Sequence, residues 1–591
     1  MTAASPLPPA QARYNRMLLL VAGLGGLLYG VDVGIIMGAL PYLAATSGLS
    51  AGQLSFIAAA VLLGGAISTL FAGVLADLFG RKWMMTLSGL LFVVSIPTIS
   101  LAHGYWPLVF GRLLQGISGG LIGVIIPLYL AECLDASSRG KGTAIFQWLL
   151  TLGIMAAAFV GLYFSGRVDE VAKLGDAAKL LTFEDRAWRS IFWVSLPPGV
   201  LFVAGTFFMA ESPRWLFRRN RIEAARVALL RSRSIEQAET ELKEMRATAA
   251  AEKAKSAAGS EAGRESLLHR KYVIPFVLAC IILACNQATG VNSIIPFSTT
   301  IFLQGGLSDF HAHLGSVFLT IVNFGVTMAA VALVDRRGRK FLLSLGSAGI
   351  IVSLLCAGIV SRQSESQRVD CRAAAQAMVT TNQDFKLAYN ADTAARLLPG
   401  GSTNGAPSTM IIVYSYGDFR AVTAAVRSDD SGAKPVEITR DALPHTKVEA
   451  FFANPFANLD AARTAPLHID NALITPVPSS QHGWTVAICV YVFMAFFAIG
   501  PGVCVWLALS ELMPTRIRSN GMSIALLINQ AVSATIAAAF LPVVGKYGVS
   551  TMFFLFAGCT VVYFVTAAFF LPETKGKTLE EIEAFFDRPK A

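Results

Sequence analysis

The chain has 591 residues, of which 54% are hydrophobic and only 15% are charged. Because charged residues normally make up about a quarter of a soluble globular domain, this balance excludes that class and fits an integral helical membrane protein. The formal net charge of +10 does not indicate nucleic-acid binding. The basic residues fall in short loops between apolar segments, where they set the orientation of a membrane protein.

Twelve apolar segments are long enough to cross a bilayer, which takes roughly 20 residues. Loops rich in Arg and Lys alternate with loops that carry few, so the positive-inside rule predicts that both termini (1–16 and 572–591) are cytoplasmic. We expect a multi-pass protein of the plasma or inner membrane. The segments lie near residues 17–43, 53–76, 83–102, 107–132, 142–165, 190–210, 272–304, 313–334, 341–360, 483–511, 519–545 and 549–571.

Two polar blocks interrupt the spans. Residues 211–271 have helical spacing and are rich in Arg, Lys, Glu and Ala, which predicts a cytoplasmic helical linker with a flexible stretch near 248–264. Residues 361–482 follow the ninth span, so they form an extracytoplasmic insertion. It has a helix-like start, RAAAQAMV, and a strand-like piece, TMIIVYSY.

The polar signatures of the first half recur in the second half. Asp77-Leu-Phe-Gly-Arg-Lys82 returns as Asp335-Arg-Arg-Gly-Arg-Lys340, and Glu132 with Arg139 returns as Glu511 with Arg518. The spacings agree once 361–482 is set aside as an addition to the second half. The repeat predicts two six-helix halves, 17–210 and 272–360 with 483–571, and a substrate site between them near the membrane midplane. We expect the insertion to be an accessory module outside the transport core.

One carboxylate, Asp32, lies near the middle of the first apolar segment, among six glycines. By insertion scales a lone Asp at the centre of a membrane helix costs about 2.5–3.5 kcal/mol, so it normally faces the protein interior and has a function. Glycines permit close helix packing, which favours an interior position. The alternative is a tolerated Asp that reaches towards the interface.

Eight motifs, taken together, resemble those of the sugar porters of the major facilitator superfamily. The resemblance covers all twelve spans and implies an all-α integral membrane fold with pseudo-symmetric halves. The motifs are GRLLQGISGG (111–120), PLYLAECLDASSRGKG (127–142), ESPRWL (211–216), NQATGVN (286–292), VDRRGRK (334–340), GPGVCVW (500–506), ELMPTRIR (511–518) and PETKG (572–576).

Acidic residues stand beside the basic ones at the cytoplasmic ends of the spans. Their regular placement predicts ion pairs between helices that close the cytoplasmic side and break when it opens; the alternative is that the basic residues only set topology. The predicted gate comprises Asp77, Arg81, Glu132, Arg139, Glu211, Arg214, Asp335, Arg339, Glu511, Arg518 and Glu573.

The resemblance also implies a sugar site. Amides donate and accept hydrogen bonds as sugar hydroxyls do, and an indole face packs on the C–H face of a sugar. For any one amide, the alternative is a hydrogen bond between helices. The implied residues are Gln147, Asn286, Gln287, Asn292, Asn323, Trp506 and Asn529.

Several positions depart from the family pattern. The family usually has two glutamines where this chain has Asn286 and Gln287, and an aromatic pair where it has Pro296 and Phe297. Gln530 stands where Trp is common, and Ala498 where some relatives carry Glu. Gly290 and Pro296 favour a break in the seventh span, as expected for a helix that moves at the site.

Arg112 is the other charged residue deep within an apolar segment, the fourth. We therefore expect it to pair with Asp32, which would offset part of the cost of burying either residue. A distance between them that changes as the halves rock would switch Asp32 between protonated and ionised forms. The resemblance agrees, because proton-coupled sugar porters carry Asp at this position and passive ones typically carry Asn.

The sequence therefore predicts a monomeric transporter, not an enzyme, that imports a monosaccharide with protons by alternating access. The partners are the sugar, protons and the bilayer. The eight cysteines show no metal-ligand spacing, and we expect no metal and no cofactor other than the proton gradient. One alternative is a passive uniporter of a sugar or cyclitol. Another is a sugar sensor, which the short C-terminal tail disfavours.

Overall fold

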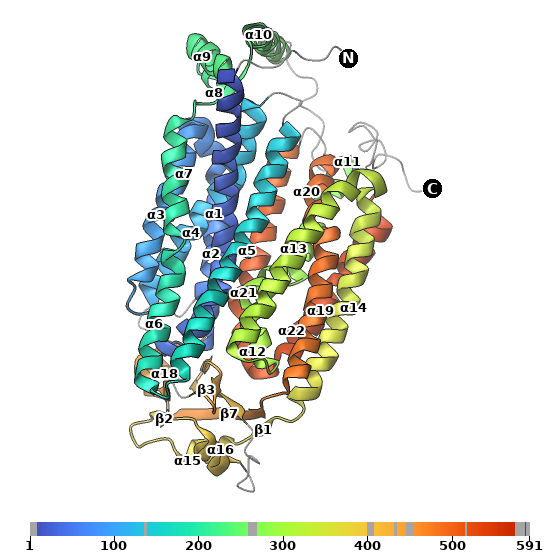
Figure 1. Cartoon of the computed structure of the whole chain (residues 1–591). Helices are drawn as coiled ribbons and strands as arrows, with labels where there is room; N and C mark the ends of the chain where they lie inside the picture. Colours follow the sequence, from blue (N-terminus) through green and yellow to red (C-terminus); the bar gives the residue numbers. More distant parts are fainter. Residues whose placement is uncertain are drawn as a thin grey trace.

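The computed structural model describes residues 9–134, 139–257, 269–398, 407–430, 434–444, 457–513 and 517–573, together with Asn454 and Phe586. Long helices form two bundles that stand side by side (Figure 1). A small β-rich unit lies across one end of both bundles, which we call the sheet end. Three further helices lie at the opposite end, which we call the linker end.

The described residues contain twelve helical segments long and apolar enough to span a membrane, as the sequence predicts. The first half comprises α1 (Pro9–Ser47), α2 (Ala51–Phe79), α3 (Arg81–Ser100), α4 (Tyr105–Cys133) and α5 (Arg139–Ala172), and a sixth span made of α6 (Ala177–Trp193) and α7 (Leu196–Phe208).

The second half comprises α11 (Arg270–Ala288) and α12 (Val291–Gln304), then α13 (Asp309–Arg337) and α14 (Arg339–Glu365). It continues with α19 (Ser480–Ile499) and α20 (Pro501–Leu512), α21 (Arg518–Tyr547), α22 (Val549–Val565) and the short turn η3 (Thr566–Phe570).

The seventh span breaks where the sequence predicts a break. Gly290 separates α11 from α12 with φ +88°, a left-handed conformation that favours glycine. A Cβ atom there would lie 2.3 Å from the ring of Phe556, so no other residue fits. Pro296 lies inside α12.

The linker holds α8 (Pro213–Arg218), α9 (Ile222–Ser232) and α10 (Ile235–Ala257). The stretch expected to be flexible, 248–264, is helical as far as Ala257, because Ala and Lys are good helix formers. Residues 258–264 lie outside the described part of the chain.

The insertion folds as an antiparallel sheet with short helices. Its sheet has the order β1-β7-β3-β4, with β5 also on β3, and β2 pairs separately with β6. The strands are β1 (Val369–Asp370), β2 (Phe385–Leu387), β3 (Ser408–Tyr416), β4 (Phe419–Val422), β5 (Val426–Arg427), β6 (Val436–Ile438) and β7 (Leu467–Pro476). The helices are α15 (Arg372–Ala377), α16 (Ala391–Leu397), α18 (Leu459–Thr464) and the 3-10 turn η2 (Arg440–Ala442).

Both faces of β3 are buried. Side chains alternate across a strand, so Met410, Ile412 and Tyr414 enter the core of the insertion itself. Ile411 and Val413 point the other way and join the apolar core formed by the helices. The sheet therefore packs directly on the bundle, and β4 contacts both α2 of the first half and α21 of the second.

The two halves are joined at the sheet end. Ser55 of α2 donates to the carbonyl oxygen of Ala537 on α21 at 2.7 Å, and Tyr42 of α1 donates to Asp309 of α13 at 2.6 Å. The bundle is thus closed towards the sheet.

Candidate functional site

The two charges at depth lie together between α1 and α4. Arg112 Nη1 is 3.8 Å from Asp32 Oδ1, and each residue is only 1% exposed. The close approach is possible because Gly119 faces the carboxylate: a Cβ there would lie 2.9 Å from Asp32 Oδ2. The pair is within ion-pair distance but too far apart for a hydrogen bond.

Arg112 has a second partner that sequence reasoning missed. Its Nη1 donates to Gln115 Oε1 at 2.6 Å, while neither oxygen of Asp32 accepts a hydrogen bond from the described residues. Gln115 lies three residues after Arg112, a spacing that places both on one helix face and could have revealed it. A buried carboxylate without donors is costly when ionised, so Asp32 is suited to bind a proton.

A cluster of amides joins α11 and α12 to α21. Gln287 Nε2 donates to Asn529 Oδ1 at 3.2 Å, and Asn292 Nδ2 donates to Gln287 Oε1 at 2.8 Å. Asn292 also donates to Ser533 Oγ at 2.9 Å, and Asn529 donates to the carbonyl of Leu283 at 3.0 Å. Three of the predicted sugar-site residues are therefore brought together, with Ser533 as an additional member.

The other predicted sugar-site residues lie apart from this cluster. Asn286 faces α22, where Tyr563 donates to its Oδ1 at 3.5 Å. Gln147 on α5 and Asn323 on α13 are half-buried, and neither side chain has a hydrogen-bond partner within the described part of the chain. The Trp506 side chain lies outside the described part, although its backbone belongs to α20.

At the linker end of the first half, the buried Arg81 is the centre of a charge cluster. It pairs with Asp77 and with Glu132, each at 2.9 Å, and is 1% exposed. Ser212 donates to Glu132 at 2.5 Å. These contacts tie α2, α3 and α4 together, so the ion pairs of Arg81 run within one half.

Glu211, which follows α7 in the chain, contacts the same cluster. It accepts hydrogen bonds from the backbone N–H groups of Arg81 and Lys82, where a carboxylate also meets the positive end of the α3 helix dipole. Burial raises the pKa of the Glu211 carboxyl, and these N–H donors together with that of Ser212 oppose the rise.

The second half repeats this arrangement. Glu573 accepts from the backbone N–H groups of Arg339 and Lys340 at 3.1 and 3.2 Å, at the start of α14. Gly80 and Gly338 precede the two helices with φ +97° and +88°, and a Cβ on either would collide with the capping carboxylate. The pseudo-symmetry predicted from the sequence is therefore present in the carboxylates that cap α3 and α14.

Five members of the predicted gate remain to be placed. Arg214 is half-buried at the start of α8, and its Nε has no hydrogen-bond partner within the described residues. The side chains of Arg139, Asp335, Glu511 and Arg518 lie outside the described part.

A cavity of about 1130 Å³ lies at the sheet end between the insertion and the bundle. It is lined by the ends of α1, α2 and α6 and by β3 and β4, with Glu184, Asp309, Arg427 and Lys546 among its charged groups. None of the amide cluster lines it. This cavity, which we call the sheet-end cavity, is therefore separate from the candidate sugar site.

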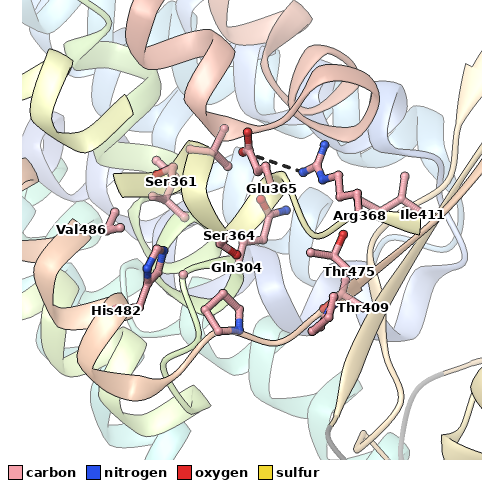
Figure 2. Close-up of a pocket in the computed structure, with 15 residues that line it drawn as sticks. Gln304, Ser361, Ser364, Glu365, Arg368, Thr409, Ile411, Thr475, His482 and Val486 are labelled. Atoms are coloured by element: carbon pink, nitrogen blue, oxygen red, sulfur yellow. Dashed lines mark ion pairs between the residues drawn. The ribbon is translucent and has the colours of Figure 1, made fainter. Parts of the chain in front are cut away.

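A second, small cavity of about 50 Å³ marks the junction of the insertion with the spans. Glu365, the last residue of α14, pairs with Arg368 at 3.8 Å, and both line this cavity together with Thr409 and Thr475 of the sheet (Figure 2). Glu365 also accepts hydrogen bonds from the backbone and hydroxyl groups of Ser550, at the start of α22. It thus anchors two spans where the insertion begins. No group of three His, Cys, Asp or Glu side chains among the described residues is arranged to hold a metal ion.

Comparison with known proteins gives consistent matches along the whole chain. The family of sugar (and other) transporters matches residues 18–389 and 471–586. The chain is 25% identical over 572 residues to the glucose transporter GlcP of Staphylococcus epidermidis, covering 96% of this chain and 97% of that protein. It is 26% identical over 577 residues to the human proton myo-inositol cotransporter, covering 96% and 81%.

The fold is also similar to that of the xylose transporter XylE from E. coli in an inward open conformation. The TM-score is 0.62 at 19% identity, and the match covers 96% of this chain and 98% of that one. The interruption of the family match at 390–470 falls within the insertion. The chain belongs to the sugar (and other) transporter family, the sugar porters of the major facilitator superfamily.

Proposed function

We propose that this sugar transporter imports a monosaccharide together with protons by alternating access. The observation that carries the proposal is the Asp32–Arg112 pair, which is buried, within ion-pair distance and not hydrogen-bonded. A purely structural pair would be expected to satisfy its donors and acceptors, because an unsatisfied buried charge is destabilising. The name of the human relative, a proton cotransporter, is consistent with this role.

Arg112 then acts as a switch between two acceptors. When Asp32 is ionised, the guanidinium is drawn towards the carboxylate; when Asp32 is protonated, that attraction is lost and Arg112 stays with Gln115. In the structure Arg112 is 2.6 Å from Gln115 and 3.8 Å from Asp32, which is the arrangement expected with Asp32 protonated. Movement of α1 against α4 would shift Arg112 back and release the proton.

The amide cluster supplies the sugar site in this proposal. Gln287, Asn292 and Asn529 hydrogen-bond one another and Ser533, and each bond can be exchanged for one to a sugar hydroxyl. Gln147 and Asn323, from α5 and α13, would complete the site when the halves close around the sugar. Asn286 and Trp506 remain candidates on the strength of the family resemblance.

The orientation follows from the loop charges, with the linker end and both termini in the cytoplasm and the sheet end outside. Closure at the sheet end then makes this an inward-facing state. In the outward-facing state the charged clusters at Arg81 and Arg339 would meet across the halves. We expect the monomer to be the transporting unit, with no cofactor beyond the proton gradient.

Uptake of a panel of labelled monosaccharides and cyclitols into transport-deficient cells, with and without a protonophore, tests the proposal. We expect one substrate class to accumulate above its external concentration and to lose that accumulation, but not its entry, when the protonophore is added. Equilibration without accumulation in both conditions would identify a uniporter instead. Vector-only cells give the background.

A further inference from the structure

A second titratable group lies between the halves, at the sheet end. His313 on α13 is 1% exposed, and both of its ring nitrogens face main-chain carbonyl oxygens. Nδ1 lies 2.9 Å from the oxygen of Asp309, and Nε2 lies 3.3 Å from the oxygen of Gly38 on α1. A carbonyl oxygen only accepts, so both contacts are hydrogen bonds only when each nitrogen carries a proton.

The carboxylate of Asp309 completes this contact. Its Oδ2 accepts from Tyr42 of α1 at 2.6 Å and from Ser165 of α5 at 2.5 Å, and its Oδ1 is 3.4 Å from His313 Nδ1. The His313 ring stacks on Tyr42 with 5.5 Å between ring centres. Three bonds, from Tyr42, Ser165 and His313, thus cross from one half to the other, and we call these four residues with Gly38 the outer latch.

The Asp309 carboxylate beside the ring favours a positively charged His313, whereas burial of the ring opposes the charge. The charged neighbours of the outer latch come from α5, α6, the start of α13, α21 and the insertion. The acids are Asp169, Glu184 and Asp430, and the basic groups are Lys173, His311, Arg427 and Lys546.

The His313 ring reaches α1 because glycines let α1 and α5 pack closely beside it. A Cβ on Gly161 of α5 would lie 2.9 Å from Gly38 Cα and 3.3 Å from His313 Cδ2. An outward opening that separated α1 from α13 would break the Nε2 contact with Gly38 and open His313 to the sheet-end cavity, where it could exchange its proton with water.

We propose that His313 is a proton-sensing gate residue: protonated from the outside, it closes the outer latch, and its deprotonation releases that latch. The proton enters from the external water and returns there, so it does not cross the membrane and does not replace the one carried by Asp32. The direction suits an importer, because external protons then favour the step that closes the outside behind the bound sugar.

Labelling of a cysteine placed below the outer latch tests this directly. Met37 is 1% exposed, lies against Ser298 of the other half, and becomes reachable from outside only when the sheet end opens. Met37→Cys in intact cells is treated with a membrane-impermeant maleimide at about pH 5.5 and about pH 8, the range in which an ordinary histidine changes charge. Rates are divided by those of the unfolded protein, because thiolate reactivity itself rises with pH. The chain without Met37→Cys gives the background from its own cysteines.

The corrected labelling rate should rise several-fold from the lower to the higher pH. In His313→Gln this rise should vanish, while the matched control His311→Gln, an exposed histidine one half-turn away, should keep it. Tyr42→Phe, which removes one bond of the outer latch but no titrating group, should raise labelling at both pH values and leave the rise intact.

A flat pH dependence in the parent Met37→Cys protein would overturn the proposal without any further variant. So would a His313→Gln protein that retains the full rise, or labelling only after permeabilisation, which would contradict the orientation on which the proposal rests. The measurement needs neither sugar nor proton flux, so a failure of the symport proposal would leave its result unchanged.

Discussion

In the proposed mechanism, Arg112 and its two acceptors, Asp32 and Gln115, control the release of the proton. Arg112→Leu removes the positive charge beside Asp32, which favours the protonated carboxyl. Proton release would become slow, so we expect net uptake at neutral pH to fall while sugar–sugar exchange persists. Arg112→Lys keeps a positive charge and should restore part of the net uptake. Equal loss of exchange and net uptake in both variants would show that Arg112 only holds the bundle together.

The amide cluster gives a second prediction at this scale. Gln287→Ala and Gln147→Ala each remove a hydrogen bond worth about 0.5–1.5 kcal/mol, so the apparent KM should rise by about two- to tenfold at normal surface expression. Gln481→Ala, at an exposed glutamine at the start of α19, serves as the control and should leave KM unchanged. Unaltered KM in both site variants would contradict the site assignment.

Single residues differed in how far the sequence could identify them. Asp32 and Arg112 stood out because charges are rare in apolar spans. Gln287, Asn292 and Asn529 came from the family resemblance, and only the structure shows that they bond one another while Asn286 faces α22. The outer latch escaped notice because Asp309 and His313 sit at the end of a span, where polar residues are ordinary.

At the scale of elements, each half uses one carboxylate to cap the helix after its second span. The repeated motif predicted this symmetry, and Glu211 and Glu573 occupy equivalent places at α3 and α14. The sequence placed Glu211 and Glu573 in a gate of ion pairs. The structure adds that both accept backbone N–H groups, which a list of charged residues does not reveal.

Gly80→Ala tests the importance of that cap. Its φ of +97° is strained for alanine, and the added Cβ would lie 2.3 Å from Glu211 Oε2, so we expect a loss of about 1–3 kcal/mol and a lower thermal midpoint in detergent. Gly73→Ala on α2 meets nothing within 4 Å and is the matched control, expected to leave the midpoint unchanged or slightly higher. A midpoint in Gly80→Ala as high as in the control would contradict the cap.

At the scale of the whole molecule, the insertion is both an addition to the fold and a part of its outer surface. The spacing of the repeat predicted an insertion over 361–482, whereas α14 runs to Glu365 and α19 begins at Ser480. It could not predict the contact with the bundle, because the continuous apolar run of β3 does not tell which partner covers which face. Ile411, Val413 and Val422 in fact share a core with the helix ends.

Replacement of residues 369–479 by a short Gly/Ser linker separates these roles. We expect the variant to insert and retain some transport, with a lower thermal midpoint because the buried contacts of Ile411 and Val413 are lost. A cut at Val360 also removes Glu365, the anchor of α22, and should be less stable still. If the 369–479 variant inserts but no longer binds sugar, the insertion is part of the site.

We propose that Asp32 carries the proton that drives sugar import. Asp32→Asn keeps the size of the side chain and resembles the protonated acid, so the loaded carrier can still reorient but has no proton to release. In proteoliposomes with an imposed pH gradient, we predict that this variant exchanges labelled sugar across the membrane yet never accumulates it. An Asp32→Asn protein that still concentrates sugar several-fold would contradict the account.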